Sequence, residues 1–225
     1  MPLAGKGMLL TSMDVDAADE AEFNRWYDRE HLEERVAIDG FLEARRYIVD
    51  EGSPKYLCLY STTAIEVLDS PAYRNRLANP TEWSRKTMAR FRNMIRAVAR
   101  ITISRGQGRG AALGIIRFRP VAGREDKLRE SLQHVLDPQG LDGILSMHLI
   151  ESDPALSGPT TEIPSTASAG AGDWFMLMDA TDVNAFRTVG LAARLKDTTG
   201  LIAAVISIGT YRLMWDLAKS DIALT

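Results

Sequence analysis

The residues best suited to chemistry lie at positions 23–41, FNRWYDREHLEERVAIDGF, in and just after a helix predicted over 18–37. On a wheel of about 100° per residue, Glu30 and Glu34 fall inside the apolar face and His31 lies at its edge. That face is defined by Phe23, Trp26, Tyr27, Ala37 and Ile38, and Leu32 lies opposite. Carboxylates and an imidazole in an apolar stripe break the binary pattern, and such breaks are often functional. Apolar surroundings disfavour a charged carboxylate and histidine titrates near neutral pH, so the group suits acid–base work.

These residues receive distinct expected roles. We expect His31 to be the general acid or base, Glu30 the carboxylate that orients it, and Tyr27 a donor to a carbonyl or enolate oxygen. The residues expected to bind substrate are Trp26, Glu34, Arg45, Arg46 and His148. A structural alternative stays open, in which Glu30 pairs with Arg45 or Arg46 on the next strand and His31 makes a structural hydrogen bond.

The chain contains an internal repeat. The run IDGFL at 38–42 is echoed by LDGIL at 141–145, an offset of 103, and Tyr56 of KYLCLY matches Trp174 of DWFMLM, an offset of 118. The second copy therefore carries an insertion of 15 residues within 153–172. This stretch is rich in Pro, Ser, Thr, Ala and Gly, and we expect a mobile loop.

Each copy predicts the order β-α-β-β-α-β, which is the ferredoxin-like arrangement of the α+β class. The first copy predicts strands from Gly7 and at 41–50, 56–63 and 98–104, and helices at 18–37, 65–77 and 81–96. We expect two tandem halves, 1–105 and 111–225, joined by the linker 106–110. Strands such as YLCLY and WFMLM are apolar throughout and need burial on both faces. We therefore expect the halves to close one intrachain α/β barrel, with the ligand cavity between their sheets.

The second copy provides a control. Its first helix has an uninterrupted apolar face made by Leu128, Leu132, Val135 and Leu136. His134 points away from that face, and we expect it to be exposed to solvent. The polar site is therefore expected in the first copy only.

Composition excludes several classes of function. The formal net charge of −3 gives no field that favours nucleic acid or acidic membranes, so we expect neither as a partner. No apolar run approaches the roughly 20 residues of a membrane span, and acidic residues come too early for a signal peptide. We expect a cytoplasmic protein whose single cysteine, Cys58, is a buried thiol. The three histidines lack metal-ligand spacing, and no nucleotide motif occurs, so we expect no metal and no cofactor.

The run WYDREHLEERVAIDGFLEARRY resembles the first helix and second strand of EthD-like members of the dimeric α/β-barrel superfamily. The resemblance is specific over 23–47, where the family carries a WY-x-x-EH-x-P type signature. Two departures are Glu34 following Glu33 where the family often has proline, and the absence of the signature from the second copy. The resemblance implies that Tyr27 and His31 line the cavity and that no cofactor is obligatory.

The expected function is a cofactor-independent enzyme of catabolism or secondary metabolism. It would decarboxylate, dehydrate, cyclise or isomerise an apolar, most simply aromatic, small molecule by acid–base chemistry. The alternatives are a non-catalytic protein that binds a small ligand, and a haem-dependent or oxygen-dependent monooxygenase-type barrel. In the haem version His148 is the only obvious axial ligand. A homo-oligomer is compatible with each of these functions.

Overall fold

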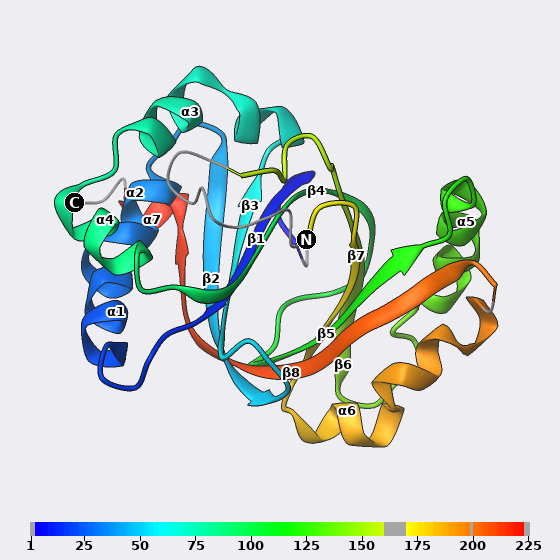
Figure 1. Ribbon diagram of the computed structural model, residues 1–225. Helices are drawn as coiled ribbons and strands as arrows, with labels where there is room; N and C mark the ends of the chain where they lie inside the picture. The colour runs from blue at the N-terminus through cyan, green and yellow to red at the C-terminus, as the bar shows by residue number, and fades with distance from the viewer. Residues whose placement is uncertain (1–2, 160–169, 199, 223–225) are drawn as a thin grey trace.

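The computed structural model describes residues 3–159, 170–198 and 200–222 (Figure 1). The first half of the chain comprises β1 (Gly7–Asp14), α1 (Glu20–Trp26), the π-helical turn η1 (Tyr27–His31), α2 (Leu32–Val36), β2 (Phe41–Glu51), β3 (Tyr56–Thr62), the 3₁₀ turn η2 (Ile65–Asp69), α3 (Pro71–Ala78), α4 (Glu82–Met88) and β4 (Arg92–Gly106). The second half comprises β5 (Ala112–Pro120), α5 (Glu125–Val135), β6 (Ile144–Ser152), β7 (Trp174–Ala180), α6 (Asn184–Val189), the 3₁₀ helix η3 (Leu191–Thr198), β8 (Ile202–Ala218) and α7 (Lys219–Ile222).

The eight strands form a closed antiparallel barrel in the order β1-β3-β2-β8-β5-β7-β6-β4. Each half therefore contributes four adjacent strands in β-α-β-β-α-β order, and the α+β class predicted from the sequence is confirmed. The two halves meet at two seams, where β2 pairs with β8 and β4 pairs with β6. None of the described helices is long and apolar enough to cross a membrane.

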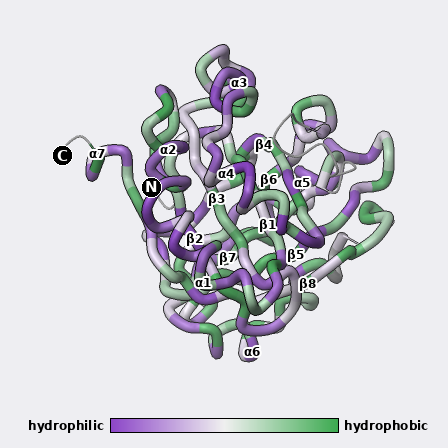
Figure 2. The backbone as a smooth tube through the Cα atoms, turned by 60° about the vertical axis from the view of Figure 1, so that its left-hand side comes forward, coloured by the Kyte–Doolittle hydropathy of each residue, from purple (hydrophilic) through white to green (hydrophobic). Residues whose placement is uncertain are grey.

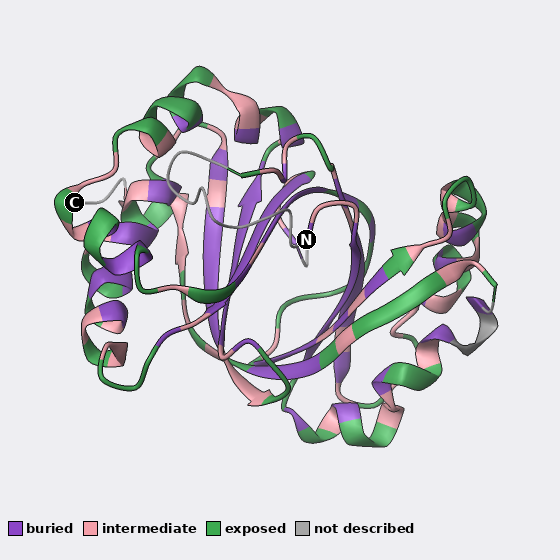
Figure 3. Cartoon of the chain, viewed as in Figure 1, coloured by how far each residue is buried: buried purple, intermediate pink, exposed green. Residues whose placement is uncertain are grey.

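Successive side chains of a strand point to opposite faces, so every strand of the barrel has an inner and an outer face. The inner faces pack together into one apolar cluster, and the barrel strands are buried throughout much of their length (Figure 3). The helices of the first half cover the outer face of β1–β4, while α5, α6 and η3 cover β5–β7. Figure 2 shows long hydrophilic stretches on α3, as expected for a helix that faces solvent.

The described residues leave little room for the cavity expected between the sheets. Apolar side chains and a polar cluster that includes Arg45, His148 and Asp179 occupy the barrel interior. A space of about 20 Å³ remains at one end, beside Pro54 and Tyr211. A single water needs roughly 10–15 Å³, so this space cannot hold an aromatic ligand.

The helix predicted over 81–96 is shorter than expected, because α4 ends and β4 begins within that range. Met94 and Val98 pack outward beneath the helices, while Ile95 and Ala97 point into the barrel. This alternation buries both faces of an extended strand, which a helix at this place could not do.

The loop expected over 153–172 is only partly described. Its residues 160–169 lie outside the described residues, so mobility there stays a prediction. Residues 153–158 contact β4, and the backbone N–H of Asp153 donates to the carbonyl of Val98 over 2.7 Å. This part of the insertion is therefore attached to the barrel.

We expect neither half to fold alone. Expressed separately, residues 1–105 and 111–225 would each expose an apolar inner face and lose both seams. Each half should be insoluble alone, and co-expression should restore soluble protein. A stable, soluble monomer of residues 1–105, seen by size-exclusion chromatography and circular dichroism, would show that the halves are independent domains.

Candidate functional site

The first helix contains a π-helical turn, which changes which residues face the sheet. The backbone N–H of Leu32 donates to the carbonyl of Tyr27, five residues earlier, so the turn holds one residue more than an α-helical turn. Residues after it are rotated relative to a regular wheel. His31 and Leu32 are consequently buried, while Ala37, predicted to face the sheet, is exposed. The wheel therefore misplaced Leu32. Turns of this kind occur frequently at functional sites.

His31 is held among aromatic rings. Its imidazole stacks on the indole of Trp26 with ring centroids 4.1 Å apart, and it meets the rings of Tyr27 and Tyr60 edge-on at 5.1 and 6.3 Å. Burial lowers the pKa of His31 well below its usual 6.5, and the nearby positive charge of Arg35 lowers it further. The imidazole is therefore neutral at physiological pH and can accept a proton.

A small cavity of about 30 Å³ lies beside His31, between the outer face of the first sheet and the helices. Its walls come from β1, β3, β4 and the helical elements η1 to α4: Leu9, Thr11, Met13, Tyr27, His31, Arg35, Tyr60, Tyr73, Leu77, Met88, Phe91, Met94 and Arg96. The site thus lies outside the barrel, in the first half, and the helices form its cover.

Three polar atoms in the cavity wall are buried without a hydrogen-bond partner among the described residues. They are Thr11 Oγ1, His31 Nδ1 and Tyr60 OH. Such an atom typically costs roughly 1–3 kcal/mol, because it has lost water and gained nothing in return. The Tyr27 side chain lies close to both Thr11 and Tyr60, and the hydrogen-bonding capacity that remains around the space can be met by water or by polar groups of a ligand.

The phenols of the site are proton donors at neutral pH. Burial raises the pKa of Tyr27 and of Tyr60 above the usual 10.0. Burial also raises the pKa of the Cys58 thiol to about 12, and this cysteine is free and buried as predicted. These groups therefore stay uncharged, and the phenols are suited to donate hydrogen bonds to a ligand oxygen.

Positive charge surrounds the cavity. Arg35 and Arg96 are buried in its wall. Arg96 donates to the carbonyl of Leu156 over 2.8 Å, so the insertion of the second copy helps to position it. Arg46 lies behind the Tyr27 ring, 4.2 Å from its centroid. A negative charge that develops in the cavity would therefore be stabilised.

Glu30 and Glu34 make structural contacts at the rim of the site. The carboxylate of Glu30 accepts from Trp26 Nε1 at 3.2 Å, from Thr81 Oγ1 at 2.6 Å and from Ser84 Oγ at 3.1 Å. It thereby ties the π-turn to α4, whose first turn is capped by Thr81. Its placement beside Trp26 holds the ring on which His31 stacks. Glu34 forms an ion pair with Arg76 of α3 at 2.7 Å.

The alternative pairing of Glu30 with Arg45 or Arg46 is wrong. Arg46 bonds to Asp28 at 3.2 Å, on the helix side of β2. Arg45 is its neighbour on the same strand and therefore points to the opposite face, into the barrel. There it pairs with Asp179 of β7 at 3.1 Å.

His148 also lies inside the barrel, apart from the cavity beside His31. Its ring nitrogens lie 3.0 Å from Ser146 Oγ and 3.0 Å from Ser104 Oγ. The residues that were expected to form one site therefore lie in two separate places. Trp26, Tyr27 and His31 come together at the cavity with Arg46 behind them, whereas Arg45 and His148 belong to a buried polar cluster at the seam between the halves.

A haem bound through His148 does not fit this structure. Both ring nitrogens of His148 are engaged and the side chain is fully buried. Beside His31, the closed cavity of about 30 Å³ could admit a porphyrin, like any other ring system, only if the site opened. Within the described residues, no group of three His, Cys, Asp or Glu side chains could hold a metal ion.

The polar wall residues Thr11, Arg35, Tyr60 and Arg96 were not assigned to the site from the sequence. Arg35 follows His31 by four residues and so shares its helix face, a signal that was available once His31 was suspected. Thr11 and Tyr60 belong to apolar strands that pair with each other, and nothing local separates them from core residues. Arg96 was assigned to a helix.

Comparison with known proteins identifies the class of fold. No family model and no curated protein matches the sequence. An anthrone oxidase-like protein of solved structure matches with a TM-score of 0.68 and 9% identity, over 95% of this chain and 93% of that one. A monooxygenase candidate from Lactobacillus acidophilus matches with a TM-score of 0.60 and 9% identity, over 96% and 97%. A haem-binding protein from Thermus thermophilus matches with a TM-score of 0.52 and 10% identity, over 98% and 94%.

At these identities the likeness shows the fold alone. The chain is an α/β barrel of ferredoxin-like units, the architecture on which these neighbours are built. Fold does not determine the reaction, which must be argued from the site.

Proposed function

We propose that this chain is an enzyme that removes a proton from an aromatic small molecule with an enolisable or phenolic group, using His31 as general base and no obligatory cofactor. The observation that carries the proposal is the cavity in which His31 Nδ1, Tyr60 OH and Thr11 Oγ1 have no hydrogen-bond partner among the described residues. The EthD-like resemblance of the WYDREH run supports the same residues. Within the barrel superfamily, we propose membership of that subgroup.

The chemistry follows from the groups around the space. His31 takes the proton, and the electron pair left behind delocalises onto the ring system and its oxygen. Tyr60 donates a hydrogen bond to that oxygen, and the nearby arginines stabilise its negative charge. Decarboxylation, isomerisation and cyclisation all pass through such an anion, and so does reaction with dioxygen.

The site must open before a substrate can enter it. The cavity of about 30 Å³ holds about two water molecules. Its cover includes α3, of which Tyr73 is the only fully buried residue. A helix held by so little buried surface can move at low free-energy cost. We expect α3 to swing outward together with the Met88 and Met94 side chains, which are flexible enough to repack around a ring.

Anthrone is a suitable first probe, because a fold neighbour is described as anthrone oxidase-like. In the net reaction anthrone and dioxygen give anthraquinone and water. The methylene loses its two hydrogens, one oxygen atom becomes the new carbonyl, and the other leaves as water with those hydrogens. His31 would accept the first proton. Anthraquinone absorbance and oxygen uptake should both exceed the rates in buffer.

The outcomes of this assay separate the classes of function. Binding of anthrone without turnover, measured by fluorescence titration, would support a non-catalytic binding protein instead. If anthrone neither binds nor reacts, mass spectrometry of compounds that co-purify with the protein tests the proposal independently. A non-aromatic co-purified ligand in the cavity would contradict it.

The rate should also depend on pH, falling in acid but not between neutral and basic pH. The folded protein holds the pKa of His31 well below 6.5 because of burial and adjacent arginine charge. The base is therefore fully available at pH 6.5 and above, and the enzyme-dependent rate should be level there. It should fall only in clearly acidic buffer. A half-maximal rate near or above neutral pH would indicate a different base.

A further inference from the structure

The strands β4 and β8 occupy equivalent places in the two halves. Each is longer than the stretch over which any one neighbouring strand pairs with it. β4 has 15 residues and pairs with β1 over 92–100 and with β6 over 99–106. β8 has 17 residues and pairs with β5 over 202–212 and with β2 over 210–218. One edge of β4 at 92–98, and the matching edge of β8 at 202–209, therefore has no strand beside it.

In the first half, the chain covers its own edge. Residues 153–158 continue from β6 along β4. The N–H of Asp153 donates to the carbonyl of Val98 at 2.7 Å, and the Ser157 hydroxyl accepts from the N–H of Val98 at 2.9 Å. This covering segment is the start of the insertion that distinguishes the second copy.

At the β8 edge, the loop in the equivalent position is the β2–β3 hairpin, and it is too short to cover that edge. The β2–β3 hairpin turns within 52–55 and contacts β8 at Ile208, Gly209 and Tyr211. Within the described part of the chain, residues 202–207 have no such cover. Val205, Ile206 and Ile208 are 49%, 39% and 38% exposed, and Figure 3 shows this part of β8 as exposed.

The exposed edge also lacks the usual protection against association. Sheet edges are commonly protected by lysine or proline, but residues 201–211, LIAAVISIGTY, contain no charged residue and no proline. The pairing with β5 skips Ala203 and Ile206. Those irregularities twist the strand without making it polar. Exposed apolar surface of this kind usually marks a contact site.

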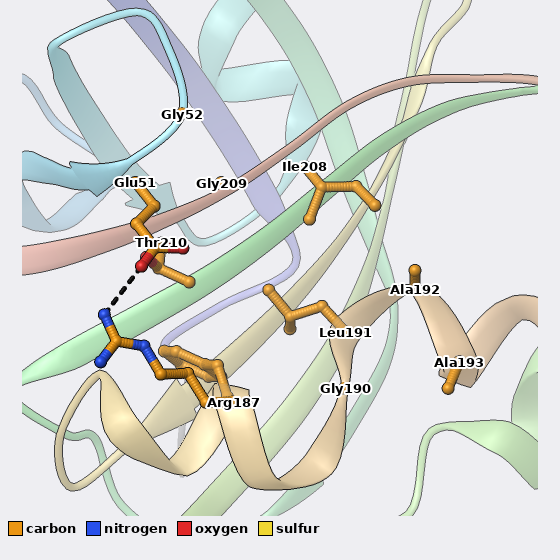
Figure 4. A pocket seen from close by; sticks show the side chains of 11 residues that line it. Glu51, Gly52, Arg187, Gly190, Leu191, Ala192, Ala193, Ile208, Gly209 and Thr210 are labelled. Carbon is orange, nitrogen blue, oxygen red and sulfur yellow. Dashed lines mark hydrogen bonds and ion pairs between the residues drawn. The ribbon is translucent and has the colours of Figure 1, made fainter.

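An open groove of about 370 Å³ adjoins the edge (Figure 4). Its apolar wall is made by Phe186, Leu191 and Ile208, and the ion pair between Arg187 and Glu51, 2.7 Å long, lies at its rim. A surface that lies against the β8 edge could therefore insert an apolar side chain into this groove.

We propose that residues 202–208 of β8, together with this groove, form the interface of a two-fold dimer of this chain. An uncharged edge meets its own copy without like-charge repulsion, so it is complementary to itself. The equivalent edge on β4 is already occupied at Val98 by residues 153–158, so we expect each molecule to offer one such edge. One self-complementary edge per molecule gives a closed dimer rather than an open fibre. The proposal does not rest on the proposed function.

The test compares the mass of three proteins in solution. Sedimentation velocity over a concentration series should show the wild-type chain as a dimer. Val205→Lys should be a folded monomer, because it places like charges opposite each other near the two-fold axis. We expect its dissociation constant to rise by roughly 100-fold or more. Met214→Lys is the control, since Met214 is equally exposed on β8 but lies beyond the free edge, and it should remain a dimer.

A second measurement covers the case in which the lysine variant fails to fold. Val205→Cys changes little in size or charge and should be crosslinked between chains by a short bismaleimide. The buried Cys58 thiol, whose pKa is raised to about 12, should stay unreactive and leaves the wild type uncrosslinked. A wild-type monomer at all concentrations would overturn the proposal. So would a dimer that Val205→Lys leaves intact, or a Val205→Cys dimer that does not crosslink.

Discussion

His31→Gln is expected to lower turnover of an aromatic probe by about 10²–10⁴-fold, the usual contribution of a general base. Glutamine is close in size and polar, but it cannot accept a proton near neutral pH. Within the described part of the chain, His31 Nδ1 has no hydrogen-bond partner to lose. The free energy of unfolding should therefore change by only about 1 kcal/mol. Anthraquinone formation and a urea melt on the same preparation measure the two effects.

The matched control for this variant is His134→Gln. His134 lies on α5, the equivalent helix of the second copy, and is exposed there as predicted. Its replacement should change neither turnover nor stability. If His31→Gln turned over the probe at the wild-type rate, His31 would not be the base. If it were strongly destabilised, by as much as a buried ion pair is worth, the histidine would be structural.

Stability in acid provides an independent readout on His31. Its pKa in the folded chain lies below the usual 6.5 that an unfolded chain shows. Between those two values the unfolded state binds more protons, so the wild type loses stability as pH falls below about 6.5. The His31→Gln variant lacks this titration and should lose less. Melting temperatures of both proteins across that window should therefore converge in acid.

The architecture was predictable because it depends on repeated and periodic signals. The offsets of 103 and 118 between matching segments reveal two copies and an insertion, and apolar strands indicate sheets buried on both faces. The barrel follows from those features. Its pairing order could be inferred because the ferredoxin-like unit fixes which strands lie at its edges.

The site was predictable only in part, because two local events decide it. The π-helical turn adds a residue at Tyr27–His31. A helical wheel assigns the same angular step to every residue, so it cannot represent the rotation that this extra residue causes. It moved His31 from the edge of the apolar face into the wall of the cavity, and it moved Glu30 toward α4. The histidine was suspected for its chemistry although the angle assigned to it was inaccurate.

The second factor is the alternation of side chains between the two faces of a strand. The sequence already shows this alternation for Arg45 and Arg46, but the prediction did not use it. Arg45 and Arg46 are adjacent on β2, so they must point to opposite faces and cannot both line one pocket. This alternation alone could not say which faced the helices. That depends on long-range partners, namely Asp179 of β7 for Arg45 and Asp28 at the π-turn for Arg46. Neither contact leaves a trace in the local sequence.

Asp179→Ala is expected to lower the free energy of unfolding by roughly 3–5 kcal/mol. Asp179 is fully buried, pairs with Arg45 across the two halves, and lies 3.5 Å from the ring of His148. Removing it leaves the Arg45 guanidinium inside the barrel beside the more distant carboxylate of Glu43, 3.6 Å away. The loss should appear as a lower midpoint in urea denaturation.

Two further variants identify the cause of that loss. Glu82→Ala removes a carboxylate from the surface ion pair with Lys86, whose side chains are 72% and 69% exposed, and should leave the stability nearly unchanged because solvent screens that pair. The double variant Arg45→Met with Asp179→Leu removes both buried charges together. It should recover much of the free energy of unfolding that Asp179→Ala loses, because buried apolar side chains give up no favourable hydration that contacts must replace. If Asp179→Ala is no worse than Glu82→Ala, the buried pair does not hold the seam. If the double variant is worse than the single one, the remaining contacts of the polar cluster, and not the loss of Asp179 beside the Arg45 charge, carry the stability of that seam.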